Sequence, residues 1–472
     1  MDQDIVDYVL DYAQGKGVEY AEVRAHTQRL DSLVLRNGVL QAYTSTDDSG
    51  FCVRVLAGGG IGFASSNRWT REEAKAVVDL VLKHAKAARR KEKIVFAKEK
   101  GVETKWTVGQ KRKVEDVSAG ERVEVFVDVQ KALAGCGVKV DASVAGCSVD
   151  LVSKYFVNSE ASCISSFVPR LGAYVFITVA ERGKMEQAGE QFGYSGGWEA
   201  VKEWNIADKM VEDAKVLKNV IVKGKAVKAG KMDLVCGPEV SGIAAHESCG
   251  HPMEADRILG REMSQAGKSF IYEGGPYWIG SRIGSEAVTI VDDPTVGHSY
   301  GFYSFDDEGV KARRRYLYRN GVIHEFLHNR ESAAKLGVRS NGSSRAISYD
   351  REAIVRMANT FVEPGDMSEE ELIEDVKSGV FMKSFTEWNI DDKRFNQRYV
   401  GREAYLIEKG ELAVPVARPV IETTTLKFWS AVDAVSKRVE FDAGTCGKGD
   451  PMQGAPVFTG GPAIRLRRVY VK

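Results

Sequence analysis

The sequence predicts an α+β fold, with an N-terminal α/β sandwich-like region followed by a largely antiparallel β C-terminal domain. Three observations support this class. Apolar residues recur with helical spacing over residues 71–88, after Thr70 as a candidate N-cap. Asn-Gly pairs separate β-branched and aromatic runs in both halves, as in two-residue hairpins. The chain after residue 225 is rich in turn residues and short strand-like runs.

The chain has 472 residues, which is enough for two domains. We expect an N-terminal α+β domain over residues 1–225 and a C-terminal domain over residues 226–472. The N-terminal domain is expected in two sections, about 1–90 and 115–225, because the charged stretch at 91–113 is typical of a linker.

In the N-terminal domain, helical periodicity alternates with strand-like runs. The run from Gly58 to Gly62 lacks the lysine of a P-loop, so it predicts a turn between strands and not a phosphate site. Helices are predicted at residues 5–14, 71–88, 121–133 and 198–217. Strands are predicted at residues 20–25, 33–40, 50–56, 61–64, 138–144 and 173–179, the second containing the Asn37-Gly38 turn.

The C-terminal domain is predicted to begin with a strand at 232–236. Pro238 and Glu239 then open a helix, because proline and acidic residues favour the first helical turn. Hairpins are predicted at 316–323 and 404–412, and short helices at 329–336 and 369–377.

The composition excludes several classes of protein. Lysine plus arginine equals aspartate plus glutamate at 66 each, which gives no electrostatic footprint for nucleic acid. Apolar runs fall well short of the ~20 residues of a membrane-spanning helix, and the acidic start is unlike a signal peptide. Seven widely spaced cysteines fit a reducing compartment. We therefore expect a cytoplasmic protein without nucleic-acid or membrane partners.

The pattern with most chemical content is His246-Glu247-Ser248-Cys249-Gly250-His251. It differs from the zinc motif H-E-x-x-H by one extra residue. On a regular helix, positions i and i+5 diverge by about 140°, so the two imidazoles need a distortion to share a metal. A single π-type turn would restore the register. Gly250 and Pro252 are expected to allow it, by relaxing the turn and by disfavouring helical geometry at His251.

A literal H-E-x-x-H also occurs, at His324 to His328. It follows the Asn320-Gly321 turn, so it begins on or near a strand. On a strand the two histidines would lie roughly 13 Å apart, too far for one metal. We therefore interpret this pair as ordinary strand histidines.

Two histidines leave a zinc site incomplete, and Cys446 is the best third candidate. Glycines at 444 and 447 give its thiolate room to approach a metal, and Lys448 is expected to lower its pKa. The alternative is a partly exposed loop thiol. Cys249 lies inside the motif but is offset from His246 on a helix, which favours a core thiol.

These motifs resemble the TldD/PmbA family of metallopeptidases, in its TldD-like, catalytically equipped branch. The resemblance rests on the motif with Glu254 and Asp256 downstream, and on residues 301–309, 356–360, 403–407 and 444–448. It spans most of the C-terminal half and is looser before it. Pro252 departs from the glycine frequent at that position.

The resemblance implies a metallopeptidase domain over 226–472, with one Zn²⁺ per subunit held by His246, His251 and Cys446 and with Glu247 as general base. It also implies an extended peptide substrate and a dimer, either a homodimer or a heterodimer with a PmbA-like paralogue. The family has carried a gyrase-modulator label, but the balanced charge gives no support for DNA binding.

Further residues are candidates for the substrate groove, or else partners in fold-stabilising hydrogen bonds: Tyr303, Asp306, Arg345, Tyr349, Arg356 and Asn359. Three alternative functions stay open. The chain could be a non-catalytic partner subunit of a paralogous peptidase, a binding module with purely structural zinc, or a zinc amidase acting on modified peptides.

Overall fold

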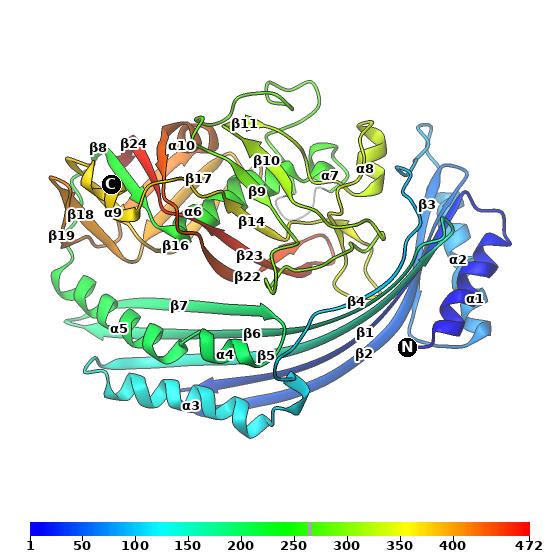
Figure 1. The fold of residues 1–472 in the computed structure, drawn as a ribbon, viewed down its shortest axis with the longest axis horizontal. Helices are drawn as coiled ribbons and strands as arrows, with labels where there is room; N and C mark the ends of the chain where they lie inside the picture. Colours follow the sequence, from blue (N-terminus) through cyan, green and yellow to red (C-terminus); the bar gives the residue numbers. More distant parts are fainter. Residues whose placement is uncertain (263–266) are drawn as a thin grey trace.

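The computed structural model describes residues 1–262 and 267–472. Long curved strands form a cradle, and the C-terminal half of the chain lies in its concave side (Figure 1). The cradle is one seven-stranded sheet in which β7 also pairs with β6. Its order along the main path is β3 (Gly60–Ser66), β2 (Val39–Ala57), β1 (Tyr20–Arg36), β5 (Val140–Asn158), β6 (Cys163–Glu181) and β4 (Glu103–Thr107), with β7 at Lys184–Ser195.

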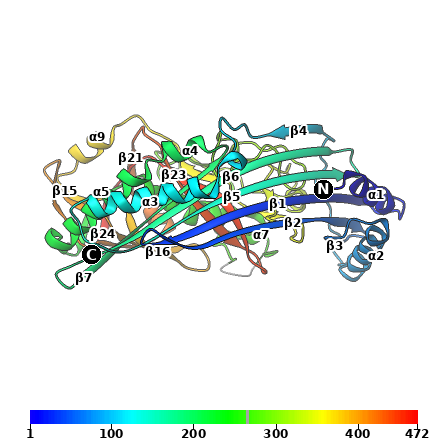
Figure 2. The same cartoon turned by 90° about the horizontal axis from the view of Figure 1, so that it is seen from below.

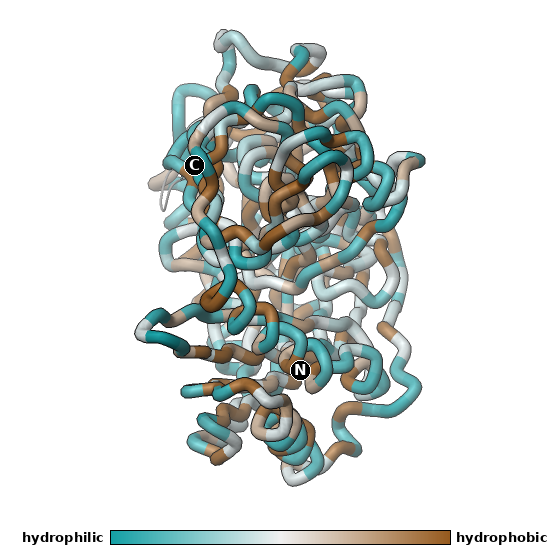
Figure 3. The backbone as a smooth tube through the Cα atoms, turned by 90° about the vertical axis from the view of Figure 1, so that its left-hand side faces the viewer, coloured by the Kyte–Doolittle hydropathy of each residue, from teal (hydrophilic) through white to brown (hydrophobic). Residues whose placement is uncertain are grey.

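Helices cover the outer face of this sheet at both ends (Figure 2). At one end α1 (Gln3–Gln14) and α2 (Arg71–Ala87) bury Val23 and Ala25 of β1. At the other end α3 (Ala119–Gly135), α4 (Glu199–Glu203) and α5 (Ile206–Lys223) bury Leu33. These β1 residues are all odd-numbered, so the even-numbered ones face the C-terminal domain. Seen from the left-hand side of Figure 1, hydrophobic and hydrophilic stretches are mixed along the backbone (Figure 3).

Two N-terminal predictions need correction. The stretch predicted as a charged linker contains strand β4, which pairs in parallel with β6, and the short helix η1 (Val114–Asp116) follows it. Both sections of the N-terminal domain therefore share one sheet. The single helix predicted at 198–217 is two helices, because Asn205 adopts a left-handed conformation with φ 48° between α4 and α5.

The C-terminal half contains two larger sheets that share one core. The first is six-stranded: β11 (Val322–Ile323), β10 (Arg315–Arg319), β9 (Ile290–Asp292), β14 (Asn359–Val362), β23 (Gln453–Gly461) and β22 (Glu440–Lys448). The second is nine-stranded: β16 (Phe385–Ile390), β17 (Asn396–Gly401), β20 (Val420–Thr424), β24 (Ile464–Val471), β8 (Gly230–Cys236), β15 (Ser378–Met382), β18 (Ala404–Glu408) and β19 (Glu411–Pro415), with β21 (Val432–Val435) on β24.

Helix α6 (Pro238–Ala245) follows β8 directly and packs against β14, β22 and β23, which places the end of α6 beside β22. Short helices and one small hairpin complete the domain: α7 (Ala255–Ile258), α8 (Arg330–Lys335), α9 (Glu369–Glu374) and α10 (Thr425–Ala431), with β12 (Ser344–Arg345) and β13 (Ile354–Val355).

The predicted α+β class is confirmed, and the pairings between named C-terminal strands are antiparallel except β14 with β23 and β8 with β15. The hairpins at Asn37-Gly38, Asn320-Gly321 and 404–412 are present. Within the described ranges, no helix has the length and apolarity needed to cross a bilayer.

Candidate active site

The two motif histidines are brought together by a π-type turn, as the spacing predicted. After α6 the backbone forms one π turn, η2 (His246–Gly250), in which the N–H of His251 donates to the carbonyl oxygen of His246. This hydrogen bond spans five residues, so positions i and i+5 lie on the same side of the helix. The two imidazole centroids are 5.0 Å apart.

The local reasons for this turn differ from those predicted. Gly250 has ordinary helical angles, so it is not needed for backbone freedom. It is needed for space, because a Cβ there would lie 1.9 Å from Met357 Sδ. His251 is also helical (φ −60°, ψ −42°), and Pro252 opens the short 3₁₀ helix η3 (His251–Met253). The expectation that Pro252 disfavours helical geometry at His251 is wrong, since the chain tightens only after that residue.

Cys446 lies on β22 beside the two histidines. Its position is fixed by pairing with β23, where Ala455 is its partner. The Sγ of Cys446 lies 3.5 Å from Nε2 of His251. One ligand atom from each of His246, His251 and Cys446 lies within 4.8 Å of the others, and all three residues are buried. Tetrahedral zinc with one nitrogen and one sulfur ligand at normal bond lengths separates them by about 3.6 Å. The three side chains therefore have the separation and chemistry of a zinc donor set.

Their protonation states also suit a metal. Burial lowers the pKa of both His246 and His251, which favours the neutral imidazole that can ligate. Burial opposes ionisation of Cys446, but His251 and Arg356 outweigh it and lower the pKa of the thiol to about 7. Within the described residues, Nδ1 of His246 is buried without a hydrogen-bond partner. A buried imidazole nitrogen that makes no hydrogen bond is available to coordinate a metal ion.

Behind His251 is a buried charge network. Nδ1 of His251 donates to Glu254 at 2.9 Å, and Glu254 also accepts from Nε of Arg257 at 2.5 Å. Burial favours the neutral acid, but Lys448, Arg257 and His251 hold the pKa of Glu254 well below its usual range. Lys448 is fully buried and its Nζ lies 2.8 Å from Asp256. Its predicted role is therefore corrected: Lys448 pairs with carboxylates, and His251 and Arg356 act on the thiol.

Glu247 lies next to His246 and forms an ion pair with Arg394. Both line the cavity described below. Arg394 is a non-glycine residue with φ 63°, a conformation that costs energy and is found at functional sites. Sequence reasoning missed Arg394, because the loop that contains it has no motif and lies 147 residues from Glu247.

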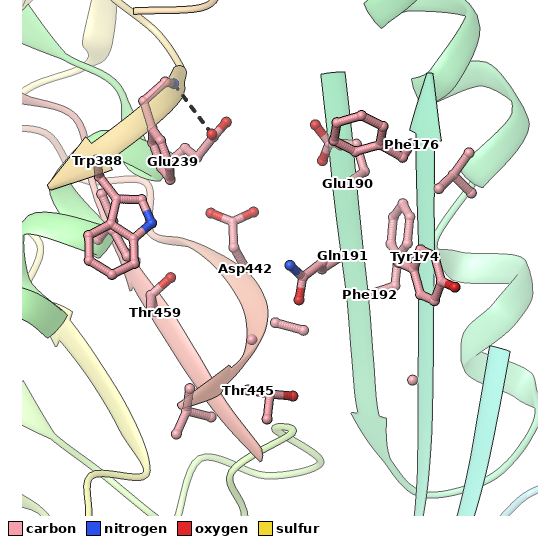
Figure 4. Close-up of a pocket in the computed structure, with 18 of the residues that line it drawn as sticks. Tyr174, Phe176, Glu190, Gln191, Phe192, Glu239, Trp388, Asp442, Thr445 and Thr459 are labelled. Atoms are coloured by element: carbon pink, nitrogen blue, oxygen red, sulfur yellow. Dashed lines mark hydrogen bonds between the residues drawn. The ribbon is translucent and has the colours of Figure 1, made fainter. Parts of the chain in front are cut away.

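A cavity of about 1340 Å³ opens in front of these side chains, and His246, Glu247, His251 and Cys446 all line it. It lies between β6 and β7 of the cradle and β16, β22 and β23 of the C-terminal domain (Figure 4). Its walls combine aromatic and acidic side chains. Those labelled in Figure 4 include Tyr174, Phe176, Phe192 and Trp388, with Glu190, Glu239 and Asp442.

The second H-E-x-x-H does not form a comparable group. His324 follows β11 and is exposed, with its ring against Tyr316. His328 is buried and its Nδ1 is 3.1 Å from the hydroxyl of Ser332. Among the described residues, only His246, His251 and Cys446 are brought together as a possible metal-binding group. The interpretation as ordinary strand histidines is wrong in its placement, because β11 ends at Ile323 and neither histidine lies in a strand.

None of the six groove candidates lines the large cavity, although Arg356 contacts Cys446 at its wall. Asn359 donates to the carbonyl of Asp293 and the hydroxyl of Ser299, and Arg356 donates to the carbonyls of Cys446 and Gln453. Tyr349 packs against Gly50 of β2. The remaining three line a smaller, separate cavity: Tyr303, Asp306 and Arg345. A substrate-binding role for these six residues stays a prediction.

Comparison with known proteins points the same way as this geometry. The model of the PmbA/TldA metallopeptidase C-terminal domain matches residues 229–472, and that of PmbA/TldA metallopeptidase domain 1 matches residues 21–85. A metalloprotease of Methanothermobacter thermautotrophicus is 33% identical over 456 residues, which cover 96% of this chain and 95% of the relative. A zinc metalloprotease TldD homolog of Saccharolobus solfataricus is 32% identical over 251 residues, 53% of each chain.

Solved structures share the fold at lower sequence identity. TldE from Thermococcus kodakarensis superposes with a TM-score of 0.75 at 18% identity, covering 99% of both chains. A Thermotoga maritima protein described as a candidate modulator of DNA gyrase superposes with a TM-score of 0.78 at 19% identity over the whole of both chains. The family model of the C-terminal domain matches more than half of the chain, and the Methanothermobacter relative is 33% identical over 96% of it. The chain therefore belongs to the TldD/PmbA family of metallopeptidases.

Proposed function

We propose that the chain is a zinc-dependent peptidase that hydrolyses peptide bonds of unfolded or extended peptides. The observation that carries the proposal is the buried group of His246, His251 and Cys446, with Glu247 beside it, at the wall of a cavity large enough for a peptide. The relatives named metalloprotease support the reaction class, and the one named zinc metalloprotease supports the metal.

In this proposal His246, His251 and Cys446 hold one zinc ion per subunit. When bound, the ion would supply Lewis acidity, polarising the substrate carbonyl and acidifying water. The carboxylate of Glu247 would accept the proton of the attacking water and pass it to the leaving amine. Arg394, ion-paired with Glu247, orients the carboxylate. Glu254 fixes the ring of His251 through Nδ1, so that Nε2 is the free nitrogen.

The substrate is proposed to bind in an extended conformation. Strand β22 is the last strand of its sheet, so one of its edges is unpaired, and residues 442–447 of β22 line the cavity. An extended peptide can pair with such an edge through backbone hydrogen bonds, which makes binding tolerant of side-chain sequence. Aromatic side chains of β6 across the cavity, Tyr174 and Phe176, would contact the other face of the peptide.

The alternative functions are less well supported. A purely structural zinc normally has four protein ligands, whereas the described residues bring three together. The partner is proposed to be a second copy or a PmbA-like paralogue, because a TldE is among the structures with this fold. An inactive partner subunit would not need Glu247 beside the three ligands.

The test compares Glu247→Gln with Glu325→Gln, the equivalent glutamate of the second motif. We expect Glu247→Gln to retain zinc and to slow hydrolysis of an unfolded peptide mixture by roughly 10²–10⁴-fold, the usual contribution of a general base. The Glu325→Gln protein should keep both zinc and activity. Full activity in the Glu247→Gln protein would refute the mechanism, and inactive zinc-loaded wild-type protein would favour the partner-subunit alternative.

A further inference from the structure

A second cavity, of about 140 Å³, lies between the concave face of the cradle and the C-terminal domain. One water molecule needs roughly 10–15 Å³, so this space accommodates a ligand of several atoms. The cradle contributes side chains of β1, β4, β5 and β6, among them Arg24, His26 and Trp106. The C-terminal domain contributes Tyr303, Arg345 and part of β23. None of the three proposed zinc ligands lines it.

The charges around this cavity are unbalanced. Four cationic side chains line it, Arg24, Lys154, Arg170 and Arg345, against the carboxylates of Asp150, Asp306 and Asp307. Lys154 forms an ion pair with Asp307 at 2.7 Å. Both oxygens of Asp306 accept backbone N–H groups instead, from Glu308, Val310 and Ser344.

Arg24 of the cradle and Arg345 of the C-terminal domain line opposite walls of this cavity, and both donate hydrogen bonds to neutral carbonyl groups. Arg24 donates to the carbonyls of Ser348 and Arg351, and Arg345 to those of Met357 and Pro456. Burial, together with the positive charges of Arg170 and Arg356, lowers the pKa of Arg345 to about 10. Burial lowers the pKa of Arg24, but Cys52, Asp307 and Glu22 outweigh it, so this charge is partly compensated at a distance. Four cationic side chains against three carboxylates still leave one excess positive charge around the cavity, which is costly in a buried site unless an anion is present.

The cavity also contains buried donors without partners. His26 is 3% exposed, and neither of its ring nitrogens forms a hydrogen bond with any described residue. The same is true of Nε1 of Trp106 and Nε of Arg24. Leaving a buried polar group unsatisfied is costly, so several such groups around one cavity indicate a ligand that satisfies them. Ordered water would supply hydrogen bonds but no negative charge.

We propose that this cavity is a binding site for a small oxyanion, either a carboxylate or a phosphate-type group, contacted by His26, Arg24 and Arg345. The ligand would bridge the two domains, because His26 and Arg24 belong to β1 and Arg345 to β12. The site is separate from the proposed peptidase centre and does not depend on the metal.

The experiment titrates the purified full-length protein with sodium phosphate and, separately, with sodium acetate. Sodium chloride at matched ionic strength serves as the reference, and the thermal midpoint of unfolding is the readout. Three variants are compared: His26→Leu, His26→Gln and His84→Leu. His26→Leu removes no protein hydrogen bond, and His26→Gln restores a donor. His84 lies on the exposed face of α2 and is the control histidine.

We expect phosphate, acetate or both to raise the thermal midpoint of unfolding in a saturable way. The anion that raises it shows whether the site binds a phosphate-type group, a carboxylate or both. His26→Leu should weaken the affinity at least ten-fold, whereas His26→Gln should stay within a few-fold of wild type and His84→Leu should match it. Phosphate bound to a metal at His246 and Cys446 would be insensitive to His26. The proposal is overturned if neither anion acts beyond the chloride reference, or if His26→Leu binds as tightly as wild type.

Discussion

Nδ1 of His251 donates to Oε2 of Glu254 at 2.9 Å, and this bond leaves Nε2 directed at Cys446 Sγ, 3.5 Å away. Glu254 is fully buried and is held in place by Arg257 and Lys448. A carboxylate behind a ligating histidine fixes the ring and raises its basicity. The relationship explains why one ring nitrogen of His251, and not the other, faces the cavity.

Replacing Glu254 with Gln should therefore weaken zinc binding by roughly 10–100-fold, the usual effect of removing such a partner. Competition with a chelator of known affinity measures it. Glu286→Gln, at a side chain that is 84% exposed, is the control and should be unchanged. Equal zinc affinity in the Glu254→Gln and wild-type proteins would contradict the orienting role.

The two H-E motifs should differ completely in metal content. Single variants His246→Ala, His251→Ala and Cys446→Ser each remove one of three proposed ligands, so each should lose zinc affinity by more than about 100-fold. His324→Ala and His328→Ala should keep one zinc per chain. Elemental analysis after dialysis against dilute chelator distinguishes the groups. Loss of zinc from the His324→Ala protein would mean that the second motif binds the metal.

Gly250 should tolerate no side chain. A Cβ at this position would lie 1.9 Å from Met357 Sδ, so Gly250→Ala overpacks the core and should cost about 1–3 kcal/mol of unfolding free energy. Gly230→Ala is the matched control, because a Cβ there meets nothing within 4 Å. Urea denaturation measures both. Adding Met357→Ala to Gly250→Ala should recover part of the loss, since the two residues share one contact; simple additivity would argue against the clash.

His328 should make the protein less stable in acid. Burial lowers its pKa from 6.5 to about 4, so the unfolded chain takes up its proton first as the pH falls. The stability contributed by neutral His328 is complete above pH 6.5 and is lost between pH 6.5 and 4, by about 3 kcal/mol.

The His328→Gln protein should therefore lose less stability than wild type across this window, as measured by urea denaturation at a series of pH values. Exposed His324→Gln is the control and should follow the wild-type profile. Identical slopes for His328→Gln and wild type would show that His328 titrates normally.

Much of the fold is encoded locally and could be predicted. The Asn37-Gly38 turn fixes the β1–β2 hairpin, and Thr70 caps α2 through a hydrogen bond to the N–H of Glu73, as expected. The positions of hairpin turns and helix starts are set by contacts between residues only a few positions apart in the sequence. Strand β4 was missed because its charged, alternating sequence is stabilised only by pairing with β6, far along the chain.

The sequence by itself determined the chemistry of the site: a His-Glu pair followed by a second histidine five residues later, and the π turn that such spacing requires. Tertiary structure decided the remainder. Cys446 reaches His251 across 195 residues, and Arg394 reaches Glu247 across 147. The tertiary structure also placed Tyr303, Asp306 and Arg345 around the smaller cavity and not around the large cavity beside His246. Contacts between distant strands depend on how sheets pair and pack, and no spacing within a single sequence records that packing.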